Sequence, residues 1–136
     1  MKLLIIYADR FSYKTTLKTL DSEADRDEQE TIEGALIGFI HVEPQDEERG
    51  SSVETHMIKH LKWAARKNET RKIVLHSFAH LAEEKGSPEF TKKLLDSAQE
   101  RLVKSDYEAL QTPFGFFLDL HVDAPGHPLA RIFKSI

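Results

Sequence analysis

Arg71-Lys72-Ile73-Val74-Leu75-His76-Ser77-Phe78 is a short, largely apolar run of β-forming residues in the middle of the chain. Its length is typical of a strand, and its continuous apolar centre predicts a strand that is buried on both faces. Amphipathic helical patterns lie on both sides of it. A buried strand between two helices indicates an α/β domain in which helices pack on a mixed sheet.

Two helices are predicted around this strand. The first begins at Ser51 or Ser52, and its apolar residues recur at spacings of three and four: Val53, Met57, Ile58, Leu61, Ala64 and Ala65. The second begins at Ser87-Pro88-Glu89, which offers a serine N-cap, a proline at the first helical position and an acid in the first turn. Its expected buried residues are Phe90, Leu94, Leu95, Ala98, Leu102 and Val103.

The remaining apolar runs predict further strands, at residues 3–8, 34–42, 107–111 and 116–122. The acidic stretch 21–30 has no clear period and is expected to be a solvated connection or a short helix. The polar segment 44–52 is expected to be a loop, and residues 129–133 a turn of helix. Because the chain is short and has no internal repeat, it is interpreted as one domain, residues 1–136.

Composition excludes several classes of protein. The chain has 136 residues, of which 40% are hydrophobic, and this is enough apolar material for a core. It has no cysteine, which excludes disulfide scaffolds, thiolate zinc sites and cysteine nucleophiles. The apolar run at its start is shorter than the roughly 7–15 residues of a signal peptide or the roughly 18 of a membrane span. We expect a soluble, cytoplasmic domain that does not contact membranes.

The net charge of −4 is unevenly distributed. Residues 21–30 carry six acids and one base, and residues 43–49 carry four acids and one base. The rest of the chain has a charge of +4 once these two acidic segments are set aside. A mildly basic body of this kind suits a small local contact with RNA better than binding along a nucleic acid.

His56 and His60 lie four residues apart on the first predicted helix, a spacing that allows two ligands to one metal. No third ligand is evident near them in the sequence, and with Trp63 and Lys67 they form a second face of the helix. We expect a surface or interface stripe there and no metal site.

Two segments carry the strongest local signals for a binding site. Phe78-Ala79-His80 ends a buried strand, where open α/β sheets commonly bind ligands, but the residues alone leave structural and functional roles for His80 equally open. The aromatic residues of Pro113-Phe114-Gly115-Phe116-Phe117 favour a core. Its glycine nevertheless permits close approach of a ligand, and a phenylalanine can stack on a base. No phosphate loop, dinucleotide fingerprint or Gly-x-Ser-x-Gly motif occurs.

Five segments together resemble the N-terminal editing domain of archaeal threonyl-tRNA synthetases: Leu3 to Asp9, Phe39-Ile40-His41-Val42-Glu43, Phe78-Ala79-His80-Leu81, Pro113-Phe114-Gly115-Phe116-Phe117 and Gly126-His127-Pro128-Leu129-Ala130. The resemblance covers essentially the whole chain. It implies a D-aminoacyl-tRNA deacylase-like fold, a homodimer, and hydrolysis of serine wrongly esterified to threonine tRNA, without a cofactor or metal. The partner would be the aminoacylated 3′ end of that tRNA. The domain would act in cis, as the N-terminal part of a longer synthetase, or in trans as a separate editing protein.

The resemblance also implies where the substrate binds. The pocket for the terminal adenosine and its aminoacyl group would be lined by Val42, Glu43, Phe78, Ala79 and His80, and closed, largely with backbone groups, by Pro113, Phe114, Gly115, Phe116 and Phe117. Arg131 is included with these substrate-binding residues. His80 matches the family histidine and is expected to position the substrate. Backbone N–H groups near Phe117 and Leu118 are expected to hold the developing oxyanion.

Four positions depart from the family pattern. Leu118 stands where the family has a lysine, Arg131 where it has an acid, and Phe116 and Phe117 where it has tyrosines. We therefore expect chemistry that uses backbone groups and the free ribose hydroxyl of the substrate more than a side-chain base. The alternatives are a free-standing D-aminoacyl-tRNA deacylase and a non-catalytic module that binds the tRNA end or dimerises.

Overall fold

Two long antiparallel strands, β1 (Lys2–Lys18) and β2 (Gln29–His41), form the centre of the sheet in the computed structural model, which describes all 136 residues. They pair from Lys2 opposite His41 to Lys14 opposite Gln29. The elements that follow are α1 (Asp46–Arg49), α2 (Ser51–Lys67), β3 (Lys72–Ser77), α3 (Pro88–Lys104), β4 (Glu108–Gln111), β5 (Phe116–Asp123), the 3₁₀ turn η1 (Pro128–Ala130) and β6 (Arg131–Ser135).

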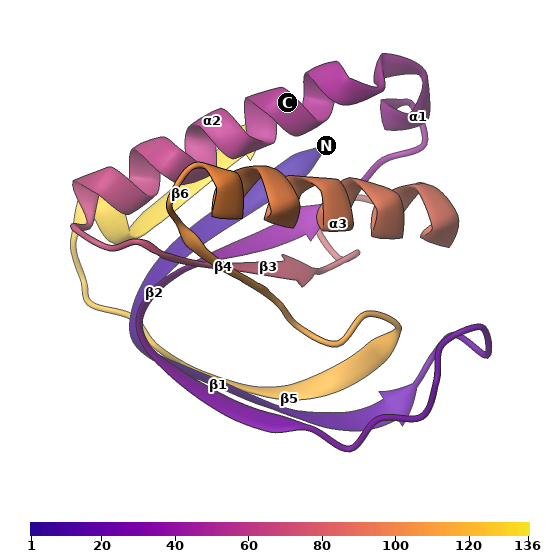
Figure 1. The fold of residues 1–136 in the computed structure, drawn as a ribbon, viewed down its shortest axis with the longest axis horizontal. Coiled ribbons are helices and arrows are strands. Elements are labelled where there is room, and N and C mark those ends of the chain that lie inside the picture. Colours follow the sequence, from indigo (N-terminus) through magenta and orange to yellow (C-terminus); the bar gives the residue numbers. More distant parts are fainter.

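The sheet has six strands in the order β4-β3-β2-β1-β5, and β6 also pairs with β1. One edge of β1 is paired with β2. Its other edge is shared, with β6 beside the first half and β5 beside the second. β2, β3 and β4 are parallel and are joined by crossovers through α2 and α3. Figure 1 shows the two helices together over one face of the sheet, while the far ends of β1, β2 and β5 curl away below them.

The curled sheet separates two hydrophobic clusters. The larger cluster lies between the sheet and the helices and includes Leu3, Met57 and Leu95. The smaller cluster lies on the opposite face of the sheet and includes Phe11 and Phe39. Both faces of the central strands are therefore buried.

The mixed α/β fold predicted from the sequence is confirmed. β3 contributes Ile73 and Leu75 to the larger cluster and Val74 to the smaller one, so it is buried on both faces as predicted. Ser87 caps α3 by accepting a hydrogen bond from the Phe90 N–H at 3.2 Å. The short strand predicted near residues 107–111 is β4.

Val103 is the exception among the residues expected to be buried in α3. Its side chain is 54% exposed, whereas Leu102 is fully buried. Successive residues of a helix are rotated by about 100°. Val103 therefore turns away from the sheet when Leu102 faces it.

β1 is longer than predicted. The sequence suggested an end at Ala8, because the charged pair Asp9-Arg10 interrupts the apolar alternation, but the strand continues well past it. Both charged residues are exposed, and the alternation changes phase there, since Ala8 and Phe11 both belong to the smaller cluster. The irregularity lies opposite Gly34, which has φ +63°. The pairing with β2 keeps one register on both sides of this point, so the strand stays intact although the apolar pattern on which the prediction depended is broken.

The prediction of a helical turn at residues 129–133 is wrong. The 3₁₀ turn η1 ends at Ala130, and β6 begins at Arg131. β6 pairs with Lys2 to Ile6 of β1, whose backbone groups on that edge would otherwise lack partners.

The connections also differ in detail from the prediction. The loop expected at residues 44–52 contains the short helix α1 and the start of α2. The acidic stretch 21–30 is a connection that runs into β2, and it contains no helix. None of the helices is both long and apolar enough to cross a membrane.

Candidate active site

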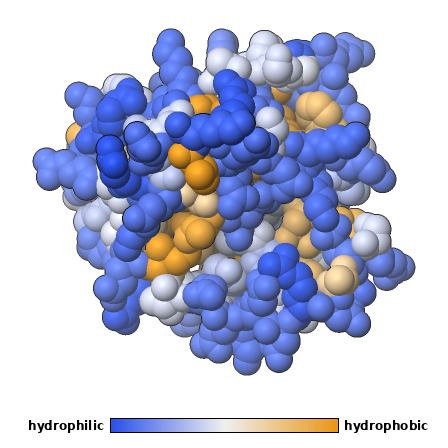
Figure 2. Space-filling view, in the orientation of Figure 1, coloured by the Kyte–Doolittle hydropathy of each residue, from blue (hydrophilic) through white to orange (hydrophobic).

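A cavity of about 470 Å³ lies between α3 and the curled part of the sheet. Its wall is built from the end of β3 and the loop after it, the end of β2, the start of α3, the segment that follows β1, and the start of β5 with the turn before it. Figure 2 shows apolar surface exposed between the helices and the curled strands, within a surface that is mostly hydrophilic. The lining residues are Thr19, Leu20, Ile40, Val42, His76, Ser77, Phe78, Ala79, His80, Lys85, Gly86, Pro88, Thr91, Pro113, Phe114, Gly115, Phe116, Phe117, Leu118 and Leu120.

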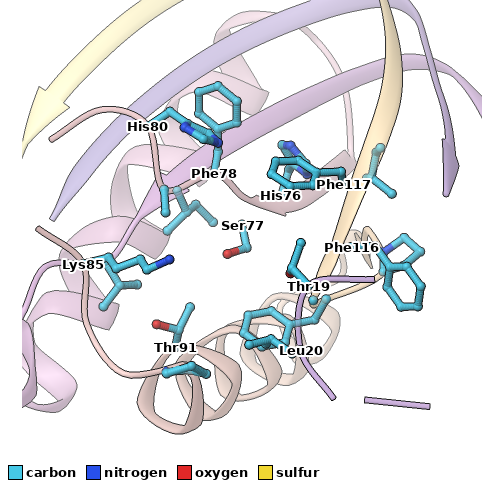
Figure 3. A pocket seen from close by; sticks show the side chains of 18 of the residues that line it. Thr19, Leu20, His76, Ser77, Phe78, His80, Lys85, Thr91, Phe116 and Phe117 are labelled. Carbon is cyan, nitrogen blue, oxygen red and sulfur yellow. The ribbon is translucent and has the colours of Figure 1, made fainter. Parts of the chain in front are cut away.

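Most of the residues predicted to form the site are brought together in this cavity. The loop after β3 and the turn before β5 lie far apart in sequence, yet both form its wall, as Figure 3 shows for His80 and Phe117. The predicted residues that line it are Val42, Phe78, Ala79, His80, Pro113, Phe114, Gly115, Phe116, Phe117 and Leu118.

Glu43 and Arg131 do not line the cavity. The Glu43 carboxylate lies 2.8 Å from the Met1 ammonium and 3.3 Å from Lys2 Nζ. Burial acts to raise the pKa of Glu43, but the hydrogen bond and charge of the ammonium, together with Lys2, lower it below its usual value. Arg131 is exposed at the start of β6, opposite Ile6. The Glu43 side chain is thus directed to the N-terminus and not into the cavity, and Arg131 lies apart from the other predicted site residues.

The loop after β3 is hydrogen-bonded to the end of β2. Ile40 O accepts from the Phe78 N–H, and Val42 O accepts from the Gly86 N–H, each at 2.8 Å. A Cβ on Gly86 would lie 3.0 Å from Val42 Cγ1. The glycine therefore permits the close approach that carries the loop along the cavity wall.

His41 holds the middle of the same loop from a buried position. The Leu81 N–H donates to its Nδ1 at 3.0 Å, and its Nε2 lies 2.7 Å from Glu84 O. Because Nδ1 accepts a hydrogen bond, Nε2 carries the ring proton and donates to Glu84. The neutral ring thereby links two points of the loop and fixes where His80 and Lys85 enter the cavity.

The turn before β5 is hydrogen-bonded to the segment that follows β1. The Thr19 N–H donates to Gly115 O at 2.7 Å. Gly115 has φ +83°, and a Cβ there would lie 2.9 Å from Glu23 Cγ and 3.3 Å from Leu20. Only glycine fits this turn without a shift of its neighbours. The prediction that β1 ends at Ala8 gave no reason to expect Thr19 and Leu20 in the wall.

A row of rings runs from the interior to the rim of the cavity. His76 meets Phe39 edge-on at 5.3 Å between ring centroids, and Phe39 meets Phe78 in the same way at 5.3 Å. Phe78 contacts His80, again edge-on, at 4.9 Å. His80 itself is exposed. Aromatic packing therefore sets the position of His80, as does the anchored loop.

His76 is the buried member of this row, and the sequence gave no specific sign that it belongs to the site. Its Nδ1 lies 2.8 Å from the hydroxyl oxygen of Thr112. Burial and the charge of His80 lower the pKa of His76 to about 4. The ring is therefore neutral at neutral pH, although it belongs to a cavity wall.

Lys85 is the only lysine in the wall, which has no arginine or acidic residue and whose other ionisable groups are two imidazoles. It takes part in none of the ion pairs of the chain. Figure 3 shows its ammonium group directed into the cavity from the loop after β3. The wall thus offers one unpaired positive charge on an otherwise polar and apolar surface.

No group of three or more acidic, histidine or cysteine residues is placed to hold a metal ion. His56 and His60 lie on α2 beside Trp63, which is 42% exposed, with Lys67 Nζ 5.8 Å from the centre of its ring. The pKa of His60 is lowered by burial and by the charges of Lys134 and His56. These residues form the predicted surface stripe, which is separate from the cavity.

Residues 1–136 match the model of a family described as the Archaea-specific editing domain of threonyl-tRNA synthetase. The chain belongs to this family.

Relatives of this editing domain are threonine–tRNA ligases. The chain is 30% identical over 139 residues to that of Methanosphaera stadtmanae and 31% identical over 139 residues to that of Thermococcus kodakarensis. Each match covers the whole chain but only 22% of the ligase. The editing domain thus corresponds to about a fifth of these longer enzymes.

A solved structure described as c-Myc DNA Unwinding Element Binding Protein shares the fold of this editing domain. The two superpose with a TM-score of 0.75, over 100% of this chain and 99% of the other, at 15% sequence identity. The likeness agrees with the mixed α/β fold expected from the sequence. At this identity it concerns the fold alone.

Proposed function

We propose that the chain hydrolyses the ester that joins serine to threonine tRNA, and so removes a mischarging error. The observation that carries this proposal is that two predicted segments share one cavity. The loop after β3 and the turn before β5, which the resemblance assigns to the nucleoside and aminoacyl group, form walls of one space of about 470 Å³. Cavities of about 300–1,000 Å³ typically hold small ligands and cofactors. An aminoacylated adenosine belongs to that size class.

Such an activity is needed because binding energy alone discriminates poorly between serine and threonine. Serine lacks one methyl group of threonine, and a pocket that fits the larger amino acid rejects the smaller one by only about 1–3 kcal/mol. A second cavity that admits serine and excludes the extra methyl of threonine removes the remaining errors. Only the terminal nucleotide has to enter it, which suits a chain with a net charge of −4.

Backbone donors at the start of β5 supply the proposed catalysis. β5 pairs with β1 on one edge and with no strand on the other. Phe117 O faces β1, where it accepts a hydrogen bond from Thr16 Oγ1 at 3.0 Å. Because backbone groups of successive residues in a strand point to opposite edges, the Leu118 N–H faces the open edge. A donor of this kind, placed on a developing oxyanion, typically contributes about 10²–10³-fold in rate.

The substrate itself supplies the second part of the proposed mechanism. The ribose hydroxyl beside the ester positions the water that attacks the carbonyl carbon. His80, held against Phe78 at the cavity rim, positions the nucleoside rather than accepting a proton. This mechanism does not need the lysine that Leu118 replaces.

One observation favours a second candidate function, a non-catalytic module that binds the tRNA end or dimerises. The Leu118 side chain packs against the smaller hydrophobic cluster, so this position offers no side-chain base. A free-standing D-aminoacyl-tRNA deacylase is the nearest enzymatic alternative. The three functions differ in which ester, if any, they cleave.

The proposal includes the partners expected from the sequence. The substrate is the aminoacylated 3′ end of threonine tRNA, and the homodimer and the cytoplasmic location stay predictions. The relatives support action in cis, since the matching segment is part of a longer threonine–tRNA ligase. Action in trans stays the alternative.

The test is deacylation of threonine tRNA charged with L-serine, L-threonine or a D-amino acid. We expect release of L-serine and retention of L-threonine. Preferential release of the D-amino acid would favour the deacylase, and binding of the tRNA end without release above the spontaneous rate would favour the non-catalytic module. Replacement of the terminal ribose hydroxyl by hydrogen should nearly abolish turnover, and an unchanged rate would contradict its participation.

A further inference from the structure

His76 is a buried ionisable residue in the cavity wall to which the proposed function assigns no role. It is held by Thr112, whose hydroxyl oxygen lies 2.8 Å from His76 Nδ1. Both residues are 6% exposed. The Thr112 N–H also donates to Leu75 O at 3.1 Å, which continues the pairing of β3 with β4. The histidine and its partner are therefore fixed by the sheet and not by a mobile loop.

Hydrogen-bond accounting assigns the tautomer of the ring. A buried hydroxyl needs an acceptor for its proton, and the only side-chain hydrogen bond that Thr112 makes is with His76 Nδ1. If the hydroxyl donates to Nδ1, that nitrogen carries no proton. The proton of the neutral ring is then on Nε2.

Nε2 has no hydrogen-bond partner within the protein, and it is not among the fully enclosed polar atoms that lack one. His76 lines the cavity, so the exposed part of its ring opens onto the same space as the start of β5. The structure thus presents a neutral N–H donor without an acceptor at the candidate active site. Burial, together with the charge of His80, keeps the pKa of this ring near 4, so the donor stays neutral across the physiological range.

We propose that His76 contacts the substrate and donates a hydrogen bond from Nε2–H to the carbonyl oxygen of the aminoacyl ester, an assignment that rests on the proposed function. As the water oxygen attacks the carbonyl carbon, the π electron pair moves onto the carbonyl oxygen, where Nε2–H joins the backbone donors of β5. The intermediate then breaks the bond between the carbonyl carbon and the ribose oxygen. The ribose oxygen takes one proton of the attacking water, so that free serine leaves and the terminal ribose of the tRNA regains its hydroxyl.

A neutral imidazole is suited to this task because it stabilises negative charge without transferring a proton. The proposal also gives Thr112 a specific role, because its hydroxyl donates to Nδ1 and so keeps the ring proton on Nε2, which faces the cavity. A purely structural His76 would require packing volume but no particular tautomer. The two roles therefore predict different results for substitutions of similar size.

The first test uses the complete chain labelled with ¹⁵N at histidine. NMR of the ring nitrogens should show His76 protonated at Nε2 and accepting at Nδ1. The amide analogue 3′-serylamino-3′-deoxyadenosine, which retains the carbonyl but resists hydrolysis, should shift the Nε2 resonance, and adenosine alone should not. A proton on Nδ1, or equal shifts with both ligands, would overturn the assignment.

The second test compares kcat and KM for His76→Gln and His76→Asn. The glutamine amide reaches the place of Nε2 and can donate there, whereas the asparagine amide corresponds to Nδ1. His76→Asn should lower kcat by about 10²- to 10³-fold with little change in KM, and His76→Gln should recover most of that loss. Urea unfolding of both variants separates loss of activity from loss of fold.

The outcomes separate this proposal from the proposed function. If the wild-type chain cleaves seryl esters and His76→Asn has a kcat within twofold of wild type, the role of His76 is contradicted and the proposed function is not. If the wild-type chain cleaves no seryl ester, the proposed function falls and the contact with the ester carbonyl falls with it. Thr112→Val adds a control, because it keeps the ring and removes only the group that fixes its tautomer. An intermediate loss of kcat is expected for it, and equal loss in all three variants would indicate a structural role.

Discussion

Acidification should destabilise this chain through His76 in particular. Its pKa is about 4 in the folded state, against 6.5 for an ordinary histidine, because burial and the charge of His80 oppose protonation. Between these pH values the unfolded chain binds a proton that the folded chain does not. The contribution of His76 to stability is therefore present above about pH 6.5 and is lost as the pH falls towards 4. At 1.36 kcal/mol per pH unit, the full difference is about 3 kcal/mol.

The assay is urea unfolding of the wild-type chain and of His76→Gln between about pH 7 and about pH 4.5. The wild type should lose about 2–3 kcal/mol more than the variant over this range, because the variant lacks the titrating ring. Glu43 has a lowered pKa in the folded state, so its contribution is lost only as the pH falls below about 4.5. That contribution is shared by both proteins and cancels in the comparison. Parallel loss of stability in wild type and variant would refute the reasoning.

Three further substitutions test the construction of the site. Leu118→Lys should change the rate of seryl-tRNA hydrolysis by less than tenfold in single-turnover assays, because the chemistry rests on backbone donors; a gain of orders of magnitude would contradict this. His41→Phe should cost about 1–3 kcal/mol in urea unfolding and speed amide exchange at Leu81, whose N–H loses its acceptor; unchanged exchange there would disprove the anchoring role. Gly115→Ala should lower the free energy of unfolding by about 1–2 kcal/mol and weaken adenosine binding, because residue 115 has a positive φ and its new Cβ would lie 2.9 Å from Glu23 Cγ. Gly126→Ala is the matched control, with open space at its Cβ, and equal effects of the two substitutions would count against this account.

Elements marked by local signals were predictable from the sequence. The Ser87-Pro88-Glu89 start of α3 depends on a cap and a first turn, and both are properties of neighbouring residues. The apolar centre of β3 likewise identified a strand buried on both faces. Such signals need no knowledge of the rest of the fold.

Elements that depend on distant partners were not predictable in this way. Arg131 to Ser135 form a strand because β1 offers them an unpaired edge, and their own sequence looked like a turn of helix. β1 itself continues past Asp9-Arg10 because β2 pairs with it in the same register on both sides of Asp9 and Gly34. In both cases the pairing partner supplied the information that the local pattern lacked.

The candidate site shows the same division. The loop around His80 and the turn around Gly115 were identified through the family resemblance, and the structure places both in one wall. His76, Lys85 and Thr19 were missed, since each reaches the cavity only through tertiary contacts. The hydrogen bond between His76 and Thr112 joins residues 36 positions apart in the sequence, and no pattern within either segment predicts it.

The course of β1 has a consequence for how the molecule melts. The strand contributes Leu3 and Ile5 to the larger hydrophobic cluster and Phe11 and Tyr13 to the smaller one. One strand thus belongs to both hydrophobic clusters, and neither cluster can unfold while the other stays folded. Calorimetry should therefore record one heat-absorption peak, and the floor of the cavity should survive until the temperature at which the entire chain gives way.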